Sequence, residues 1–471
     1  FTKMGKSLIM TLHVTPEIYT KYEEALKVDD GSCQGAQRAA PLYKQCADAG
    51  HDKAQVRYAF MCLTGKGAPQ SNDEAYKYFK MAAINYNWTG KVEVGICYFL
   101  GIGTRKMGNY AEFHLKRCAN KLMPKGQYYY AELLYQGPKL FGFGKDRELA
   151  VAYMAAAAIN QYEGASEELM KFLGDVQESS LWERYNKIKG KKRFLAPGIL
   201  YGLALKNNAD AMYNFAVNIF KGDGFPKNFN LAFKFAKMAA DLKYVKAYQL
   251  VGYLYLKGYG TEKDCKNAFY YYEMASNEGF ESAYFNLGLL YMEGTGVEQN
   301  YDNAFHYFEK AANGKCSQAF YFLAKLYKEG KGTDVNIEKY VENIEKAANM
   351  GFFKAIHEYA LYCYEHQEYE NAVHYFYMSS KYGDVTSCLY LGELCEKGLG
   401  VVVNPKNAVS WYNLGVFING DEDCCYRLAN CYENGIGVEK NIDEAINLYK
   451  KASLKHKEAK DKYDELTNNK I

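Results

Sequence analysis

Small and apolar residues recur along the middle of the chain with a fixed period of 36 residues. The repeating small residues are Ala211, Ala247, Ala283, Ala319 and Ala355. After Ala283, the residues Leu287, Gly288 and Tyr291 follow at the spacing of one face of an α-helix, and Gly294 ends the pattern. The sequence therefore predicts an amphipathic helix of about 12 residues at the start of each copy.

A second apolar face completes each copy. In the copy that starts at Ala283 this face consists of Ala304, Tyr307, Phe308, Ala311 and Ala312. Two such helices joined by a Gly-x-Gly turn form an antiparallel helical hairpin. A single hairpin cannot bury its apolar face, so we expect an all-α fold, an α/α superhelix (solenoid) of about eleven stacked hairpins. The side chains predicted to be interior are Leu287, Gly288, Tyr291, Tyr307 and Phe308.

The predicted organisation has six segments. They are an N-terminal cap or linker (1–37), repeats (38–164), a degenerate repeat with a charged insertion (165–210), regular 36-residue repeats (211–355), further repeats of which the first is shortened (356–453), and a C-terminal capping helix (454–471). In the degenerate repeat, the stretch "LGDVQESSLWERYNKIKGKKRFLAPG" replaces the glycine turn and predicts a bend or an exposed loop. In the shortened repeat, "CYEHQEYENA" lacks the glycine turn and predicts a tighter hairpin. A third stretch, "GPKLFGFGKD", lengthens another turn.

The charge balance argues against binding to nucleic acid, and the hydropathy argues against a membrane-spanning helix. The 58 basic and 55 acidic residues leave a net charge of +3, which is too even for a protein that binds nucleic acid by neutralising phosphates. The longest apolar stretch, residues 92–103, falls short of the roughly 20 residues that a membrane-spanning helix needs. We therefore expect no nucleic-acid partner and no membrane span. The basic stretch "KIKGKKR" at 187–193 is a solvated loop or a contact for an acidic partner, a membrane surface or a nucleic acid.

The thirteen cysteines fall mainly at small-residue positions of predicted helices, such as Cys46, Cys118 and Cys424. This placement favours buried free thiols and a reducing compartment. One glycosylation sequon, Asn87-Trp88-Thr89, points in the opposite direction.

No catalytic or cofactor motif accompanies the repeats. The glycine-rich turns, such as those at 65–67, 101–103 and 294–297, lack the Gly-Lys-Ser/Thr ending of a phosphate-binding loop. His306 and His374 lie on predicted second helices without the neighbouring ligands of a zinc site. We expect no enzyme activity, no cofactor and no metal.

The repeat units resemble the SEL-1-like repeat family, a relative of the tetratricopeptide repeats with a longer unit. The resemblance rests on "AYFNLGLLYMEGTGV" with "DNAFHYFEKAANG", on "AYQLVGYLYLKGYG" with "KNAFYYYEMASNEG", and on "RLANCYENGIGV" with "DEAINLYKKAS". It covers about residues 38–460 and departs from the family pattern at 165–210 and 356–386. It implies an adaptor that holds other proteins in a superhelical groove, and it implies no catalysis.

The same resemblance places a concave groove on the first helices, two, six and nine residues after each leading small residue. These positions are Tyr213, Val217, Phe220, Gln249, Tyr253, Leu256, Phe285, Leu289, Met292, Tyr321, Lys325 and Lys328. Such a surface suits an amphipathic helix or an extended segment of a partner protein, and the two lysines would select an acidic residue. The alternative is that these side chains pack on one another and close the groove.

The sequence thus predicts a non-enzymatic, protein-binding scaffold in the cytoplasm. A place in a cytoskeletal assembly is suggested by a composition rich in Tyr, Lys and Asn. Two alternatives stay open: a luminal adaptor of ER-associated degradation, or the regulatory repeat region of a larger enzyme, such as a protein kinase, whose catalytic domain precedes Phe1. The oligomeric state and the identity of the partner do not follow from the sequence.

Overall fold

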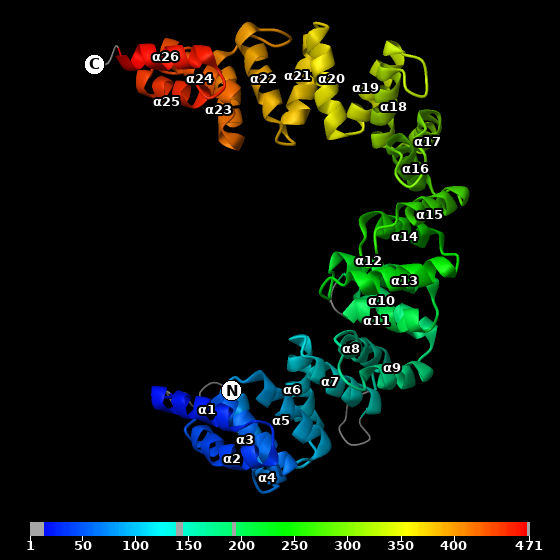
Figure 1. Cartoon of the computed structure of the whole chain (residues 1–471), viewed down its shortest axis with the longest axis vertical. Helices are drawn as coiled ribbons and strands as arrows, with labels where there is room; N and C mark the ends of the chain where they lie inside the picture. The colour runs from blue at the N-terminus through cyan, green and yellow to red at the C-terminus, as the bar shows by residue number, and fades with distance from the viewer. Residues whose placement is uncertain (1–13, 138–144, 191–194, 469–471) are drawn as a thin grey trace, which may run out of the picture. The chain divides into compact units, whose positions relative to one another are not determined.

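The chain is built from helical hairpins, as Figure 1 shows. The computed structural model describes residues 14–137, 145–190 and 195–468, and these ranges contain 26 α-helices and no strand. The predicted all-α class is confirmed. Two compact units divide the chain: unit 1 comprises residues 1–247 and 259–261, and unit 2 comprises 248–258 and 262–471.

Unit 1 holds the first thirteen helices. They are α1 (Pro16–Val28), α2 (Cys33–Asp48), α3 (Asp52–Thr64), α4 (Asn72–Ile84), α5 (Trp88–Leu100), α6 (Gly108–Asn120), α7 (Pro124–Gln136), α8 (Arg147–Ile159), α9 (Ala165–Gly174), α10 (Glu178–Ile188), α11 (Leu195–Leu205), α12 (Ala209–Lys221) and α13 (Phe229–Asp241). Hairpins form between α1 and α2, α3 and α4, α5 and α6, α7 and α8, and α12 and α13. The first four hairpins pack on one another in the order of the chain, and α11 packs on both α8 and α12.

Unit 2 holds the remaining helices, and α14 begins at the boundary between the two units. They are α14 (Val245–Lys257), α15 (Cys265–Asn277), α16 (Glu281–Glu293), α17 (Tyr301–Asn313), α18 (Ser317–Glu329), α19 (Ile337–Asn349), α20 (Phe353–Glu365), α21 (Tyr369–Ser380), α22 (Val385–Lys397), α23 (Pro405–Asn419), α24 (Glu422–Asn434), α25 (Ile442–Ala452) and α26 (Lys457–Asn468). From α16 to α25 the helices pair as five successive hairpins, and α26 packs on α25.

Glycines fix the turn inside each regular hairpin. Gly294 ends α16 in the left-handed conformation, with φ 70°. Gly296 follows at φ 76°, where a Cβ would lie 2.1 Å from the carbonyl oxygen of Cys265. The second helix then starts at Asn300, whose side chain accepts a hydrogen bond from the backbone N–H of Asn303 at 2.9 Å. The turn therefore packs directly against the preceding hairpin, and a side chain at Gly296 would prevent that contact.

The predicted interior is confirmed in part. Leu287, Gly288 and Phe308 are buried, and a Cβ at Gly288 would lie 2.6 Å from the ring of Phe308. Tyr291 and Tyr307 pack against the core but are only half-buried, so they are interior in part. Their rings stack 5.6 Å apart at 12°, which lets them cover the core while their outer edges meet water.

The described part of the segment 165–210 contains the helices α9, α10 and α11 and the start of α12. Residues 178–188 of the charged stretch form the helix α10, whose Arg184 pairs with Asp146 at the start of α8. The next helix, α11, packs on both α8 and α12. A Cβ at Gly198 of α11 would lie 2.5 Å from the carbonyl oxygen of Ala152, so α11 approaches α8 closely. The predicted bend or exposed loop stays a prediction, because residues 191–194 lie outside the described residues. The helix α10 has one buried residue, Leu181, and packs beside α8 and α11.

The other two irregular segments are simpler. The predicted tight hairpin is α20 and α21, joined by three residues, and Gln367 in the joint has φ 66°. Of the stretches with extra residues, 138–144 in "GPKLFGFGKD" and 191–193 in "KIKGKKR" lie outside the described residues.

Candidate partner-binding groove

The predicted groove residues lie on four first helices and belong to two units. Those on α12 are Tyr213, Val217 and Phe220 in unit 1. Those in unit 2 are Gln249, Tyr253 and Leu256 on α14, Phe285, Leu289 and Met292 on α16, and Tyr321, Lys325 and Lys328 on α18. Each unit is therefore described separately.

In unit 1 the predicted residues pack against neighbouring aromatic rings. Tyr213 lies 5.5 Å from Tyr244, measured between ring centroids. Phe220 lies 5.5 Å from Phe229 and 5.8 Å from Tyr259. The side chains are half-buried, so these contacts leave only part of their surface for a partner.

In unit 2 the residues on α14 and α16 also contribute to the core. Tyr253 and Leu256 are half-buried against the cluster around Tyr272 and Leu287. Phe285 lies 5.9 Å from the ring of Phe308 and 5.8 Å from that of Phe322. Leu289 and Met292 pack on the same cluster as Phe308. These contacts favour the alternative in which the groove side chains pack on one another. Each of these side chains still keeps some exposed surface.

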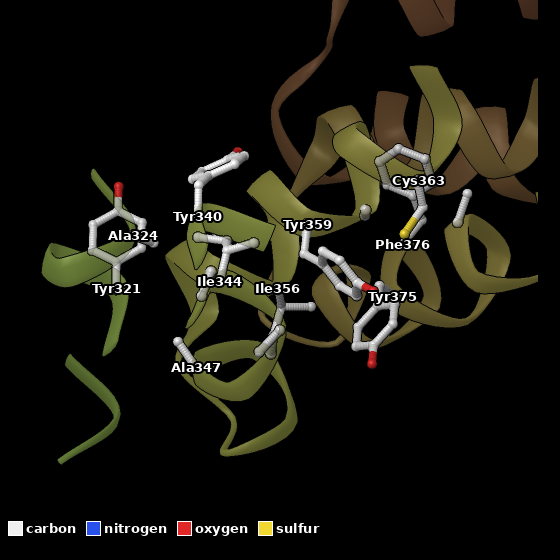
Figure 2. Packing of buried hydrophobic residues seen from close by; sticks show 14 of the residues in the cluster. Tyr321, Ala324, Tyr340, Ile344, Ala347, Ile356, Tyr359, Cys363, Tyr375 and Phe376 are labelled. Carbon is white, nitrogen blue, oxygen red and sulfur yellow. The ribbon is translucent and has the colours of Figure 1, made fainter. Parts of the chain in front are cut away.

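Tyr321 is not an exposed groove residue, and that prediction was wrong. Its side chain is 7% exposed and belongs to the core cluster that joins α18 to α22. Figure 2 shows Tyr321 beside Ala324 in this cluster, with Tyr340 and Ile344 of α19 next to them. The ring of Phe352 covers it at 5.1 Å, because the residue before α20 turns its side chain back over α18.

The two predicted lysines are partly engaged. Lys325 Nζ lies 5.4 Å from the ring centroid of Tyr321. Lys328 Nζ lies 4.8 Å from the ring of Tyr340 and 3.9 Å from Glu358 Oε1. Lys328 remains more than half exposed, so its charge still faces solvent.

A hollow of about 570 Å³ lies one hairpin further along the chain. Tyr321, Phe353, His357, Leu361, Tyr382 and Asp384 are among the residues that line it. A second hollow of about 300 Å³ adjoins it, and both share Glu358 and Leu361 of α20. We call these two hollows together the α20 groove. They give α20 a continuous concave face between α18 and the start of α22.

Asp384 organises the polar side of the larger hollow. Its Oδ2 accepts hydrogen bonds from His357 Nδ1 at 2.7 Å, from Ser379 Oγ at 2.9 Å and from Ser387 Oγ. The carboxylate thus connects α20, the end of α21 and the start of α22. Burial opposes its ionisation, but the hydrogen bonds from His357, Ser387 and Ser379 outweigh burial and hold the pKa of Asp384 at about 2.

The partner of this carboxylate is His357. The hydrogen bond with Asp384 raises the pKa of His357, and burial works against this rise. Because Asp384 is ionised, Nδ1 of His357 carries the hydrogen that it donates. Nε2 is then left to accept or donate a hydrogen bond, according to the protonation of the ring.

The α20 groove combines apolar walls with charges of both signs. Phe353 and Tyr382 are exposed aromatic residues at its rim, and Leu361 forms part of its floor. Lys354 adds a positive charge at the rim. Glu358 accepts a hydrogen bond from Tyr340 at 3.3 Å and faces Lys328. Such a surface suits an apolar anchor with polar groups on either side of it.

His357 and Leu361 were not predicted as groove residues, although the sequence carries the signal for them. The two residues stand two and six positions after Ala355, which is the same spacing that selected the predicted groove residues. The prediction ended at the last regular copy. Asp384, Ser379 and Tyr382 follow no such spacing, because they sit at the joint between α21 and α22 and reach the hollow only through the fold.

Residues 14–137, 145–190 and 195–468 contain no group of three or more His, Cys, Asp or Glu side chains placed to hold a metal ion. Within the same ranges, no helix is both long and apolar enough to cross a membrane. Ten of the thirteen cysteines are buried, among them Cys46, Cys118 and Cys424.

The sequence pattern of the Sel1 repeat matches eight segments that together make up more than half of the chain. They are residues 52–87, 124–162, 209–244, 245–280, 281–316, 317–352, 385–415 and 422–456. The chain belongs to the Sel1 repeat family. This family is generally a non-enzymatic fold for protein interaction, which supports a scaffold. Sel1 matches leave out residues 353–384, the segment that carries nearly all of the larger hollow.

One solved structure supports the fold at a TM-score above 0.5. The chain is 20% identical to a protective antigen of uropathogenic Escherichia coli with an SLR fold, at a TM-score of 0.52, covering 92% of this chain and 91% of the antigen. A Sel1 repeat protein from Oxalobacter formigenes is 28% identical over 51% of this chain and 96% of its own, at a TM-score of 0.41. Yeast Tom70 is 13% identical over 96% of both chains, at a TM-score of 0.29. No curated protein sequence matches the chain.

Proposed function

We propose that this Sel1 repeat protein is a non-enzymatic scaffold that holds a segment of a partner protein in the α20 groove. The observation that carries the proposal is the hollow of about 570 Å³ with apolar walls and an ordered Asp384–His357 pair. It occupies the hairpin that departs from the repeat pattern, where a feature particular to this chain would be expected.

The groove favours a helix or an extended segment with one large apolar side chain. Burial of such a side chain against Phe353, Leu361 and Tyr382 contributes roughly 1.5–3 kcal/mol. An acidic residue beside that anchor would meet Lys354 or Lys328, and a hydrogen-bonding group would meet Nε2 of His357. The groove therefore selects an apolar residue that is flanked by an acid.

The earlier groove residues extend this proposal along unit 2. Tyr253, Phe285 and Met292 keep part of their surface exposed, and Lys325 lies between them and the α20 groove in the chain. In the proposal they contact the rest of the partner segment. Tyr213 and Phe220 form a separate candidate contact in unit 1.

The test is peptide selection followed by measurement of affinity. Peptides are selected from a random display library on the full chain, and their dissociation constants are measured by titration calorimetry. Leu361→Lys should weaken binding by about tenfold or more, because it places a charge in the apolar floor. The matched control is Phe417→Ser, which alters an exposed aromatic residue on α23. Equal affinity for the wild type and Leu361→Lys would refute the α20 groove as the binding site.

We also propose that the scaffold is cytoplasmic. This proposal is supported by the many buried free thiols, which are typical of proteins in a reducing compartment. The sequon at Asn87 is the sequence feature that points away from a reducing compartment. Asn87 Nδ2 donates to Asp52 Oδ2 at 2.8 Å, and Oδ1 accepts from the N–H of Gly90 at 3.0 Å. A glycan on Nδ2 would displace Asp52, so this site does not favour the luminal adaptor. Membership of a cytoskeletal assembly is supported by composition alone. Imaging of a fluorescent fusion tests both the cytoplasmic location and the association with the cytoskeleton.

A further inference from the structure

An edge of unit 1 carries exposed apolar residues in strained turns. Most turns that follow a second helix place one residue in the left-handed conformation. At this position other turns have Gln161, Lys243, Lys315, Gly279 and Gly351, which are polar or lack a side chain. The turns after α4 and α6 instead have Tyr86 at φ 62° and Leu122 at φ 60°.

Tyr86 and Leu122 are also far from buried. Tyr86 is 69% exposed and Leu122 is 45% exposed. Packing in the core therefore does not offset the cost of the left-handed backbone at either residue. Ile84, at the end of α4, is exposed beside Tyr86. Residues held in unfavourable backbone conformations concentrate at functional sites. Two adjacent turns of unit 1 therefore present apolar side chains to solvent at a conformational cost.

Positive charges surround these turns. Lys91 Nζ lies 5.0 Å from the ring centroid of Tyr86 and 4.4 Å from that of Trp88. Lys121 Nζ, next to Leu122, lies 5.5 Å from the same Trp88 ring. The two turns are thus joined through Trp88 into one surface.

Arg117 of α6 extends the positive surface. Its guanidinium carbon lies 5.2 Å from the ring of Phe113, which is also exposed. Burial lowers the pKa of the nearby His114, and the charges of Arg117 and Lys91 lower it further. Within the described part of the chain, none of Lys91, Arg117 and Lys121 forms an ion pair. We call the surface formed by Tyr86, Trp88, Lys91, Arg117, Lys121 and Leu122 the basic edge.

We propose that the basic edge docks unit 1 onto an anionic phospholipid membrane. Protruding apolar side chains at the tips of turns can enter the interface between headgroups and acyl chains, where Trp and Tyr are favoured. The unpaired cations are attracted to anionic headgroups. A protruding surface fits a flat bilayer better than it fits a peptide, which is usually held in a groove. This site is separate from the α20 groove, so either proposal can fail without the other.

The test is sedimentation of the full chain with lipid vesicles. We expect binding to vesicles that contain phosphatidylserine and phosphatidylcholine, and little binding to phosphatidylcholine alone. The double variant Arg117→Glu/Lys121→Glu should weaken binding at least tenfold, because each lost cation alone costs about fivefold. The matched control is Lys243→Glu, which reverses an exposed charge elsewhere in unit 1.

A second variant separates docking from folding. Tyr86→Asn/Leu122→Asn removes the apolar tips and introduces a residue that tolerates the left-handed conformation. Vesicle binding should fall, while the melting temperature should stay equal or rise. Gln161→Asn, at the same position after α8, should leave binding unchanged.

Three outcomes would overturn the proposal. The first is an absence of binding to the phosphatidylserine vesicles. The second is equal binding of the wild type and both double variants. The third is binding of a soluble poly-glutamate peptide at the basic edge without binding of vesicles, which would assign this surface to an acidic protein.

Discussion

Single glycines decide the geometry of the turns in this protein. Gly294 and Gly296 both have positive φ, but only Gly296 lies where a Cβ would overlap a backbone atom of the preceding hairpin. The nearest atom to a Cβ at Gly294 is Gln299 Cβ at 3.2 Å, a contact that needs a shift of only a few tenths of an ångström. Conformation alone therefore requires the first glycine, and both conformation and space require the second.

This difference gives a prediction for two variants. Gly294→Ala should destabilise its hairpin by about 1–2 kcal/mol, the cost of a left-handed residue with a Cβ. Gly296→Ala should cost about 1–3 kcal/mol more, because the neighbouring backbone must also shift. Hydrogen exchange of the amides of α16 and α17 measures the local free energy of opening. Equal protection in the two variants would contradict the role assigned to Cys265.

The pair formed by His357 and Asp384 predicts a dependence of stability on pH. The folded pKa of His357 is raised, so its protonation stabilises the folded state below the unfolded value of about 6.5. This contribution is lost as the pH rises through the folded pKa. The pKa of Asp384 falls from 3.8 to about 2 on folding. The stability that this carboxylate contributes is therefore present above pH 3.8 and is lost as the pH falls through about 2.

The variant His357→Gln should therefore lose more stability at about pH 5.5 than at about pH 9. Urea unfolding at the two pH values measures the difference. His306→Gln, which replaces an exposed histidine on α17, serves as the control and should show no such trend. A loss for His357→Gln that is the same at both pH values would mean that the imidazole acts only by packing.

The sequence pattern predicted burial well where it depends on the sizes of the side chains that face each other in one hairpin. It predicted burial poorly where a residue outside that hairpin covers the side chain. Gly288 and Phe308 were predicted as interior because a close contact between helices needs one small and one large residue. Tyr321 was predicted as exposed from its position in the repeat. It is buried because Phe352, a residue outside its own helix, covers it.

At the scale of the elements, the close contact between α16 and α17 depends on one matched pair. Gly288 faces the ring of Phe308, and a Cβ at 2.6 Å from that ring cannot be accommodated without movement. Other hairpins repeat the arrangement, since a Cβ at Gly392 would lie 2.2 Å from the ring of Tyr412. Small and large residues on facing helices therefore set the distance between the two helices of a hairpin.

This pairing predicts a rescue. Gly288→Ala alone should destabilise the hairpin by about 1–3 kcal/mol through overpacking. Phe308→Leu alone should also destabilise it, because it leaves a space in the core. The loss of stability in the double variant should be smaller than the sum of the two single losses, by about 0.5–3 kcal/mol. Additive losses in the hydrogen exchange of α17 would contradict direct contact between the two residues.

Regular elements were predictable from the sequence, and irregular ones were not. The period of 36 residues predicted the hairpins between 211 and 355 because each copy repeats the same helix faces and turn glycines. The helix α10 was not predicted, because its one buried residue, Leu181, gives almost no apolar period. The contact of α11 with α8 was not predictable, since it skips the two helices between them.

At the scale of the whole molecule, each unit has its own candidate surface. Unit 2 has the α20 groove, which receives a partner segment in the proposal, and unit 1 has the basic edge. The sequence predicted a binding groove on first helices. It did not place the groove at α20, because the hollow depends on Asp384, Ser379 and Tyr382, which come from the joint after α21.

The central claim is that the α20 groove holds a segment of another protein. The most direct measurement is site-specific photocross-linking of a library-selected peptide, mapped by mass spectrometry. A photoreactive residue is placed at Leu361 in one variant and at Phe417 in the other. The account predicts that the peptide cross-links through position 361, that position 417 gives none, and that excess unlabelled peptide abolishes the product. Cross-linking at 417, or equal cross-linking at both positions, would contradict it.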